Sequence, residues 1–97
     1  MPDAKPWFVY VIECLDGSLY TGVAVNVMAR YALHATGKGA RYTRSHPPLR
    51  LAAIIEYAGR SEAQKAEYII KQLSPAQKRA LCESMPEPCR SGASLEK

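Results

Sequence analysis

The stretch FVYVIECLDGSLYTG, residues 8–22, contains two runs rich in β-branched and aromatic residues on either side of Asp16-Gly17. Such runs favour β-strands, and an Asp-Gly pair between them is a common hairpin signal. The sequence therefore predicts a β-hairpin with strands over about residues 7–15 and 18–25.

The length of the hairpin loop decides whether Tyr10 and Tyr20 face one another, because side chains alternate between the two faces of a strand. A two-residue loop directs the two rings to opposite faces. A three-residue loop, residues 15–17, places Tyr10 opposite Gly22 and both rings on one face. Gly17 can supply the left-handed residue that such a bulged loop requires. Strand physics alone leaves the register open, and a site shared by the tyrosines requires the three-residue loop.

The rest of the chain predicts three helices and one more strand. Asn26 is a suitable N-cap for a helix over about residues 27–36. The apolar run LRLAAIIEY, residues 49–57, predicts a largely buried strand. Capping boxes at Ser61 and Ser74 each predict the start of a further helix. The order β-β-α-β-α-α predicts an α+β domain in which a small three-stranded antiparallel sheet is flanked by helices.

Length and composition indicate one folded domain. The chain has 97 residues, of which 47% are hydrophobic, and residues 1–85 hold all the predicted elements. The aperiodic residues 86–97 predict a flexible C-terminal tail. No run of about 18 apolar residues exists and the N-terminus lacks a signal-peptide layout, so we expect no membrane association and a cytoplasmic location. Three cysteines without a CxxC pair predict free thiols rather than a zinc site.

Basic residues are concentrated in the middle of the chain. No acidic residue occurs between Asp16 and Glu56. The basic residues of this interval are Arg30, Lys38, Arg41, Arg44 and Arg50. Such a stretch favours a polyanionic partner such as nucleic acid. A solvated basic face that serves solubility would explain the same charges.

Two of the predicted helices place polar side chains beside apolar stripes. Arg30 and His34 lie on the side of the first helix that approaches the sheet. Arg30 there needs an anionic partner, such as a salt bridge or a bound phosphate, or a path to solvent. His34 alone is better explained as a hydrogen-bonded packing residue. Glu67 lies in or beside the apolar stripe of a later helix, where either an i,i+4 pair with Lys71 or a bound metal would satisfy its charge.

Taken together, these residues resemble the GIY-YIG nuclease family. The segments VYV, residues 9–11, and YTG, residues 20–22, correspond to the two short strand motifs that give the family its name. Arg30 matches the family's arginine on the helix after the hairpin, and His34 matches a frequent histidine one turn later. Glu67 matches the glutamate on a later helix.

The resemblance covers about Trp7 to Leu81, and the pattern GKGARYTR is similar to the small stand-alone bacterial subgroup of uncharacterised proteins. The first motif is VYV rather than GIY, so only its tyrosine corresponds. Thr21 stands where the family name has isoleucine. Asn26 is the only asparagine, so the late asparagine of some members has no equivalent.

The resemblance implies a metal-dependent endonuclease that hydrolyses phosphodiester bonds in nucleic acid, with DNA repair or processing as its setting. The catalytic residues that it implies are Tyr10, Tyr20, Arg30, His34 and Glu67. Glu67 would hold Mg²⁺ or another divalent cation such as Mn²⁺, and Arg30 would clamp the phosphate. One tyrosine would help to activate water, although its usual pKa of about 10 is high for a base. Which tyrosine does so stays open, and His34 would assist.

Lys38, Arg41 and Arg44 would contact flanking phosphates of the nucleic acid. We expect no small-molecule cofactor, and a monomer or weak dimer. The alternative is a non-catalytic nucleic-acid-binding module with the same fold. A scaffold that binds another protein is a third hypothesis, without specific support in the sequence.

Overall fold

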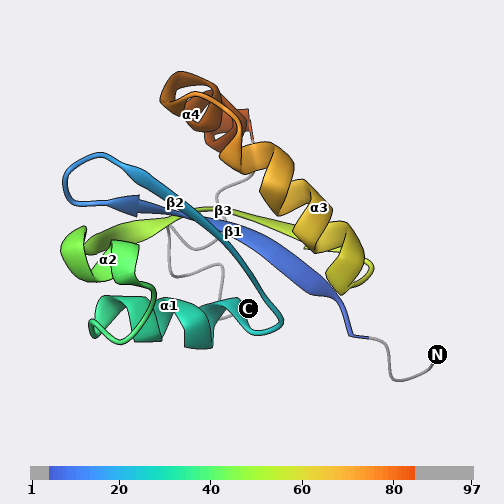
Figure 1. The fold of residues 1–97 in the computed structure, drawn as a ribbon, viewed down its shortest axis with the longest axis horizontal. Coiled ribbons are helices and arrows are strands. Elements are labelled where there is room, and N and C mark those ends of the chain that lie inside the picture. The colour runs from blue at the N-terminus through green and yellow to red at the C-terminus, as the bar shows by residue number, and fades with distance from the viewer. Residues whose placement is uncertain (1–4, 85–97) are drawn as a thin grey trace.

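The computed structural model describes residues 5–84, which form a three-stranded antiparallel sheet with helices on both faces (Figure 1). The strand order is β2-β1-β3. The elements are β1 (Trp7–Cys14), β2 (Leu19–Ala24), α1 (Val27–Ala35), α2 (Arg41–Ser45), β3 (Pro48–Tyr57), α3 (Arg60–Lys71) and α4 (Pro75–Ser84). The predicted α+β fold and its element order are confirmed, with the short α2 added in the basic connection. The predicted tail, residues 86–97, lies outside the described residues.

β1 is the central strand and is covered on both faces, so residues 9–12 are all buried. Tyr10 and Ile12 point to the face where α1 and α2 lie. Val9 and Val11 point to the opposite face, which α3 and α4 cover (Figure 1). The alternation of a strand thus gives each face of the sheet its own small core.

Two predicted helix starts are confirmed by their capping hydrogen bonds. The Asn26 side chain accepts a hydrogen bond from the Ala29 backbone N–H at 3.0 Å at the start of α1. At α4, the Ser74 N–H donates to Gln77 Oε1 at 2.9 Å, and the Gln77 N–H donates to Ser74 Oγ at 3.1 Å. This reciprocal pair is the predicted capping box.

The capping box predicted at Ser61 is wrong. The N-cap of α3 is Gly59, in extended conformation, and the helix begins at Arg60. Ser61 therefore lies inside the first turn, where its hydroxyl cannot cap the helix. The apolar stripe of α3 is as expected, because Ala63 and Ile70 are buried against the sheet.

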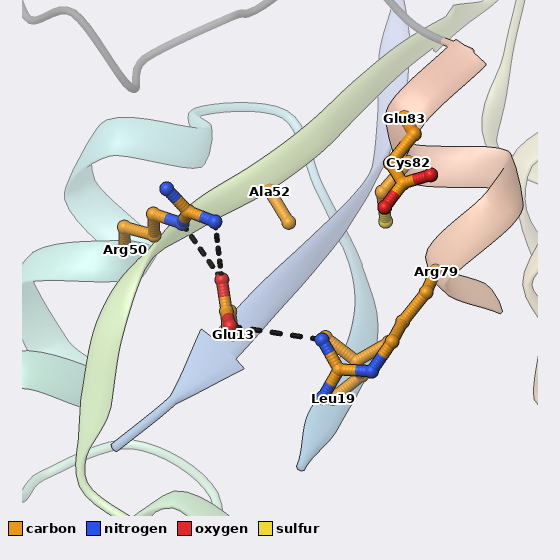
Figure 2. Close-up of a pocket in the computed structure, with 7 residues that line it drawn as sticks. All are labelled: Glu13, Leu19, Arg50, Ala52, Arg79, Cys82 and Glu83. Atoms are coloured by element: carbon orange, nitrogen blue, oxygen red, sulfur yellow. Dashed lines mark hydrogen bonds and ion pairs between the residues drawn. The ribbon is translucent and has the colours of Figure 1, made fainter. Parts of the chain in front are cut away.

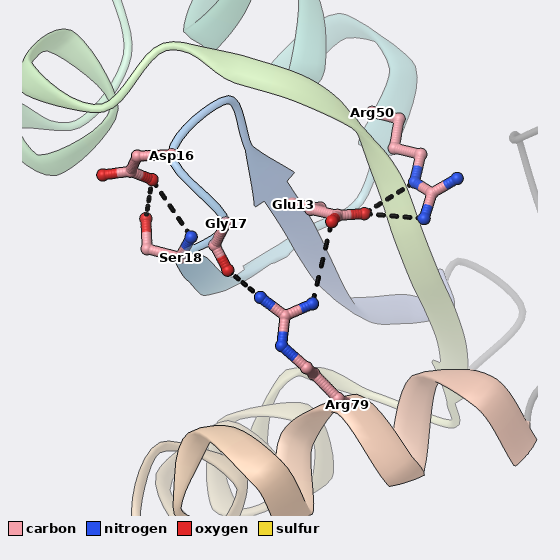
Figure 3. Close-up of polar contacts among 6 residues, drawn as sticks. All are labelled: Glu13, Asp16, Gly17, Ser18, Arg50 and Arg79. Atoms are coloured by element: carbon pink, nitrogen blue, oxygen red, sulfur yellow. Dashed lines mark hydrogen bonds and ion pairs between the residues drawn. The ribbon is translucent and has the colours of Figure 1, made fainter.

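Glu13 lies between two arginines near the end of β1 (Figure 2). Its Oε1 atom accepts a hydrogen bond from Nε of Arg50 and forms an ion pair with Nη2 of the same arginine, each at 2.7 Å. Nη1 of Arg79 lies 3.7 Å from the other carboxylate oxygen, and Arg79 also donates to the Gly17 carbonyl oxygen (Figure 3). This cluster joins β1, β3 and the hairpin loop to α4.

No helix within residues 5–84 has the length and apolar content needed to cross a membrane. Cys14 is a buried free thiol, as predicted. Cys89 lies outside the described residues.

Candidate active site

The hairpin loop has the three-residue form that a shared site requires. The Cys14 N–H donates to the Ser18 carbonyl oxygen at 2.8 Å, and Gly17 has a φ of +89°. Tyr10 lies opposite Gly22 in this register. Tyr10 and Tyr20 therefore share the face that α1 covers, with ring centroids 6.4 Å apart.

The phenol of Tyr10 lies directly over Gly22. A Cβ atom added to Gly22 would be 2.5 Å from the Tyr10 Oη and 2.6 Å from its Cζ. Such distances are shorter than any normal carbon contact, so the position of the ring depends on the missing side chain. The glycine of the second strand motif thus has a steric role here.

His34 lies on α1 and is 3% exposed. Its Nε2 atom is 3.0 Å from the Tyr10 Oη, and its Nδ1 atom is 2.7 Å from the Thr43 Oγ1. The interpretation of His34 as a hydrogen-bonded packing residue is therefore confirmed. The contact with Tyr10 also connects it directly to a predicted catalytic side chain.

Arg30 lies one turn before His34 and is exposed. Together with Tyr10, Tyr20 and His34 it lines a pocket of about 260 Å³, which is completed by Gly39 and Ala40. The sequence predicted either an anionic partner for Arg30 or a path to solvent. No carboxylate within residues 5–84 forms an ion pair with Arg30, and its side chain is exposed to solvent. Four of the five predicted catalytic side chains meet in this pocket.

Burial shifts the acid–base properties of the hydrogen-bonded pair. Burial, followed by the charges of Tyr20 and Glu67, raises the pKa of Tyr10 to about 12 against the opposing effect of Arg30. Burial, followed by the positive charge of Arg30, lowers the pKa of His34. Both shifts favour the neutral forms of these side chains at neutral pH.

Glu67 lies outside the lining of this pocket, on α3 at the opposite face of the sheet (Figure 1). Its Oε2 atom is 3.0 Å from the Lys71 Nζ, so the predicted i,i+4 pair is present. Its side chain is 21% exposed. Its charge nevertheless contributes to the raised pKa of Tyr10, which means that Glu67 and the pocket are electrostatically coupled.

The three predicted phosphate-binding residues are all exposed. Lys38 lies between α1 and α2, and Arg41 and Arg44 lie on α2. Ala40, the N-cap of α2, lines the pocket. Lys38 and Arg41 are thus next in sequence to Gly39 and Ala40, which line the pocket, and Arg44 lies further along α2.

Sequence reasoning missed a row of stacked rings that joins α2 to the hairpin. Tyr42 of α2 stacks on Tyr20 with centroids 5.8 Å apart, and His46 stacks on Tyr42 at 4.1 Å. Nε2 of His46 is 3.7 Å from a carboxylate oxygen of Asp16 in the hairpin loop. Thr43 and Gly39, which contact His34, were missed as well. The one sequence feature that could have pointed to them is their place in the segment GKGARYTR, residues 37–44. This segment resembles the family although it lies outside the two strand motifs.

A second pocket lies on the α3 and α4 side of the sheet and has the Glu13 cluster in its wall (Figure 2). Leu19, Ala52 and Cys82 also line it. It contains none of the predicted site residues. Glu13 pairs with Arg50 and Arg79, so the three charges connect β1 to β3 and α4 (Figure 3). This structural role accounts for them.

A family model described as the GIY-YIG catalytic domain matches residues 6–80. The chain belongs to the GIY-YIG family. A UPF0213 protein of Cupriavidus pinatubonensis is 45% identical over 84 residues, which cover 87% of this chain and 93% of the relative. A UPF0213 protein of Halobacterium salinarum is 52% identical over 73 residues, covering 75% of this chain and 95% of the relative.

The same relationship holds for solved structures. The solution NMR structure of the UPF0213 protein BH0048 from Bacillus halodurans is similar to this chain, with a TM-score of 0.56 and 39% sequence identity over 95% of this chain and 98% of that chain. The resemblance to small stand-alone bacterial GIY-YIG proteins is therefore confirmed. Tyr10 and Tyr20, which the resemblance assigns to the two strand motifs, lie on one face of the sheet.

Proposed function

We propose that this chain is a metal-dependent endonuclease that hydrolyses phosphodiester bonds in nucleic acid, with DNA as its substrate in repair or processing. The observation that carries the proposal is the hydrogen-bonded pair Tyr10 and His34 in one pocket with the exposed guanidinium of Arg30. Membership of the GIY-YIG family supports the same reaction class. Phosphodiester hydrolysis requires an oriented water, a proton acceptor and stabilisation of negative charge at phosphorus.

Arg30 would bind the phosphate. Its planar guanidinium can donate two parallel hydrogen bonds to phosphate oxygens, and no ion pair within residues 5–84 competes for it. The exposed Lys38, Arg41 and Arg44 would bind neighbouring phosphates of the same strand. Contacts of this kind position nucleic acid without reading its sequence and weaken as salt rises.

Tyr10 and His34 would together accept the proton of the attacking water. With a pKa of about 12, the phenol of Tyr10 is protonated at neutral pH and cannot act as a base by itself. The Nε2 atom of His34 can take the phenol proton while the Tyr10 oxygen takes one from water. The water oxygen forms a bond to phosphorus and the ester P–O bond breaks. The departing oxygen then takes a proton from solvent.

A divalent cation suits the donor chemistry of Glu67. Mg²⁺ keeps most of its waters and is commonly held by one or two carboxylates together with substrate phosphate. No group of three or more His, Cys, Asp or Glu side chains in residues 5–84 could enclose a metal, so a closed all-protein site is not the expected kind. Glu67 would hold Mg²⁺ or Mn²⁺ in competition with Lys71, and the bound ion would stabilise negative charge on the phosphate and the departing oxygen.

The test is cleavage of labelled DNA and RNA substrates, including flaps and branches, in Mg²⁺ and in EDTA. Wild type is compared with Glu67→Ala and with Glu62→Ala, an exposed glutamate on the same helix. We expect cleavage by wild type and Glu62→Ala in Mg²⁺ and its loss in EDTA and in Glu67→Ala. Cleavage that persists in Glu67→Ala would contradict the role of that carboxylate. Binding without cleavage of any substrate would favour a non-catalytic nucleic-acid-binding module.

A further inference from the structure

The buried hydroxyl of Thr43 lies at the end of a hydrogen-bonded chain that starts at Tyr10. Thr43 is the buried residue of α2 and is 2% exposed. Its Oγ1 atom lies 2.7 Å from His34 Nδ1 and 3.0 Å from the Ala40 carbonyl oxygen. The chain therefore runs from Tyr10 Oη through both ring nitrogens of His34 to the backbone of α2.

Counting hydrogens along this chain fixes the direction of every bond. A carbonyl oxygen can only accept, so the single hydroxyl hydrogen of Thr43 is donated to Ala40. The Thr43 oxygen must then accept, so Nδ1 of His34 carries a hydrogen. In a neutral imidazole, Nε2 is then without a hydrogen and must accept from the hydroxyl of Tyr10. The opposite tautomer would leave the Thr43 and Ala40 oxygens 3.0 Å apart without a hydrogen between them.

We propose that Thr43 is a positioning residue that holds His34 in the Nδ1–H tautomer, so that the unprotonated Nε2 faces the hydroxyl of Tyr10. The tautomer follows from the hydrogen bonds alone. Its catalytic consequence rests on the proposed nuclease function, in which Nε2 accepts the proton of Tyr10.

The surroundings of His34 support this assignment. A Cβ atom on Gly39 would overlap the Nδ1 atom and also approach Cγ of the ring, so Gly39 leaves room for the imidazole to reach Thr43. The titratable groups that face the ring are Tyr10 from β1, Tyr20 from β2 and Arg30 from α1. Thr43 faces it from α2. A neutral hydroxyl orients the ring without the negative charge that would raise the pKa of His34.

The tautomer can be measured directly by long-range ¹H–¹⁵N NMR of the imidazole nitrogens. The chain has two histidines, so one His46→Gln variant assigns both spectra. His46 is also an internal reference, because its Nδ1 lies 2.9 Å from the Tyr42 carbonyl oxygen. We expect neutral His34 to be the Nδ1–H tautomer in wild type and in Thr43→Ser, which keeps the hydroxyl. In Thr43→Val we expect the Nε2–H tautomer to become the major form, with His46 unchanged.

Cleavage should follow the tautomer. For metal-ligating histidines, loss of the hydrogen-bond partner of the ring typically lowers metal affinity or activity about 10–100-fold. We expect a loss of similar size in Thr43→Val, and a change of only a few-fold in Thr43→Ser. An Nε2–H tautomer in wild type, or Nδ1–H retained in Thr43→Val, would overturn the assignment whether or not the protein cleaves nucleic acid. An altered tautomer with full activity would overturn the positioning role alone. If wild type cleaves nothing, the proposed function fails while the spectra still decide the tautomer.

Discussion

Gly22→Ala should disrupt the site through a single methyl group. The added Cβ would be 2.5 Å from Tyr10 Oη and 2.6 Å from Cζ. A normal contact requires about 3.4 Å or more, so the ring must move by roughly 1 Å. Because Tyr10 is 2% exposed and belongs to the core between the sheet and α1, that movement strains its neighbours and breaks the hydrogen bond to His34.

Three contributions set the expected loss of stability. Overpacking a core typically costs about 1–3 kcal/mol, and the broken hydrogen bond adds about 1 kcal/mol. Replacing glycine by alanine returns about 0.4–1 kcal/mol through the unfolded chain. The net loss is about 1–3.6 kcal/mol, which for a domain of this size lowers Tm by roughly 4–29 °C. Cleavage should be lost at temperatures where the variant remains folded.

Thermal unfolding followed by circular dichroism measures this loss, with Gly59→Ala as the matched control. Gly59 also has an extended backbone, and its added Cβ would meet only the flexible end of Glu62 at 3.3 Å. Alanine is a poorer N-cap than glycine, which should lower the free energy of unfolding by about 0.5–1 kcal/mol. The reduced freedom of the unfolded chain should raise it by a similar amount, so the two effects nearly cancel. A Gly22→Ala protein that melts with the control and keeps wild-type cleavage would refute the close approach of Tyr10 to Gly22.

The other predictions concern the core, the buried imidazole and the α4 contact. Thr21 Oγ1 is buried without a hydrogen-bond partner in residues 5–84. The isosteric Thr21→Val should therefore raise the free energy of unfolding, measured by urea denaturation, by about 1 kcal/mol. A lower free energy of unfolding would show that the hydroxyl has a hydrogen-bond partner. Burial lowers the pKa of His34, so the unfolded state binds more protons and the free energy of unfolding should fall as pH drops below about 6.5. His34→Gln should flatten this decline as pH falls below about 6.5, and an unchanged slope would contradict a buried neutral ring. Arg79→Met removes the exposed contacts to Glu13 and Gly17 and should cost less than about 1 kcal/mol without affecting cleavage; a larger loss would mean that α4 depends on this ion pair.

The hairpin could be predicted because its signals are local. Gly17 is the residue that tolerates the left-handed conformation of a three-residue loop, and that loop determines where Tyr10 falls. Strand alternation by itself could not choose between two loop lengths, since each gives a regular ladder. The requirement that Tyr10 and Tyr20 share a site decided the register, and the strand pairing confirms it.

The partners of His34 could not be predicted from local patterns. Thr43 belongs to α2 and Gly39 precedes it. This helix has only five residues and is too short to show a hydrophobic periodicity. Their contacts with His34 depend on how the basic connection folds back onto α1. Glu13 was missed for a similar reason, because its partners Arg50 and Arg79 are distant in sequence. The start of α3 was misplaced because Ser61-x-x-Gln64 matches a capping box, whereas the chain turns at Gly59 and enters the helix earlier.

Arg30 and Glu67 come from helices on opposite faces of the sheet (Figure 1), yet the charges of both act on Tyr10. β2 is an edge strand of the sheet that residues 5–84 form. Gly22 is the residue of β2 that pairs with Tyr10, and its lack of a side chain lets the phenol extend over this edge strand. In the proposed reaction, the phosphate that Arg30 binds would lie beside Tyr10, in the pocket that both residues line. Gly22 thus fixes the position of Tyr10, the proposed proton acceptor, in that pocket.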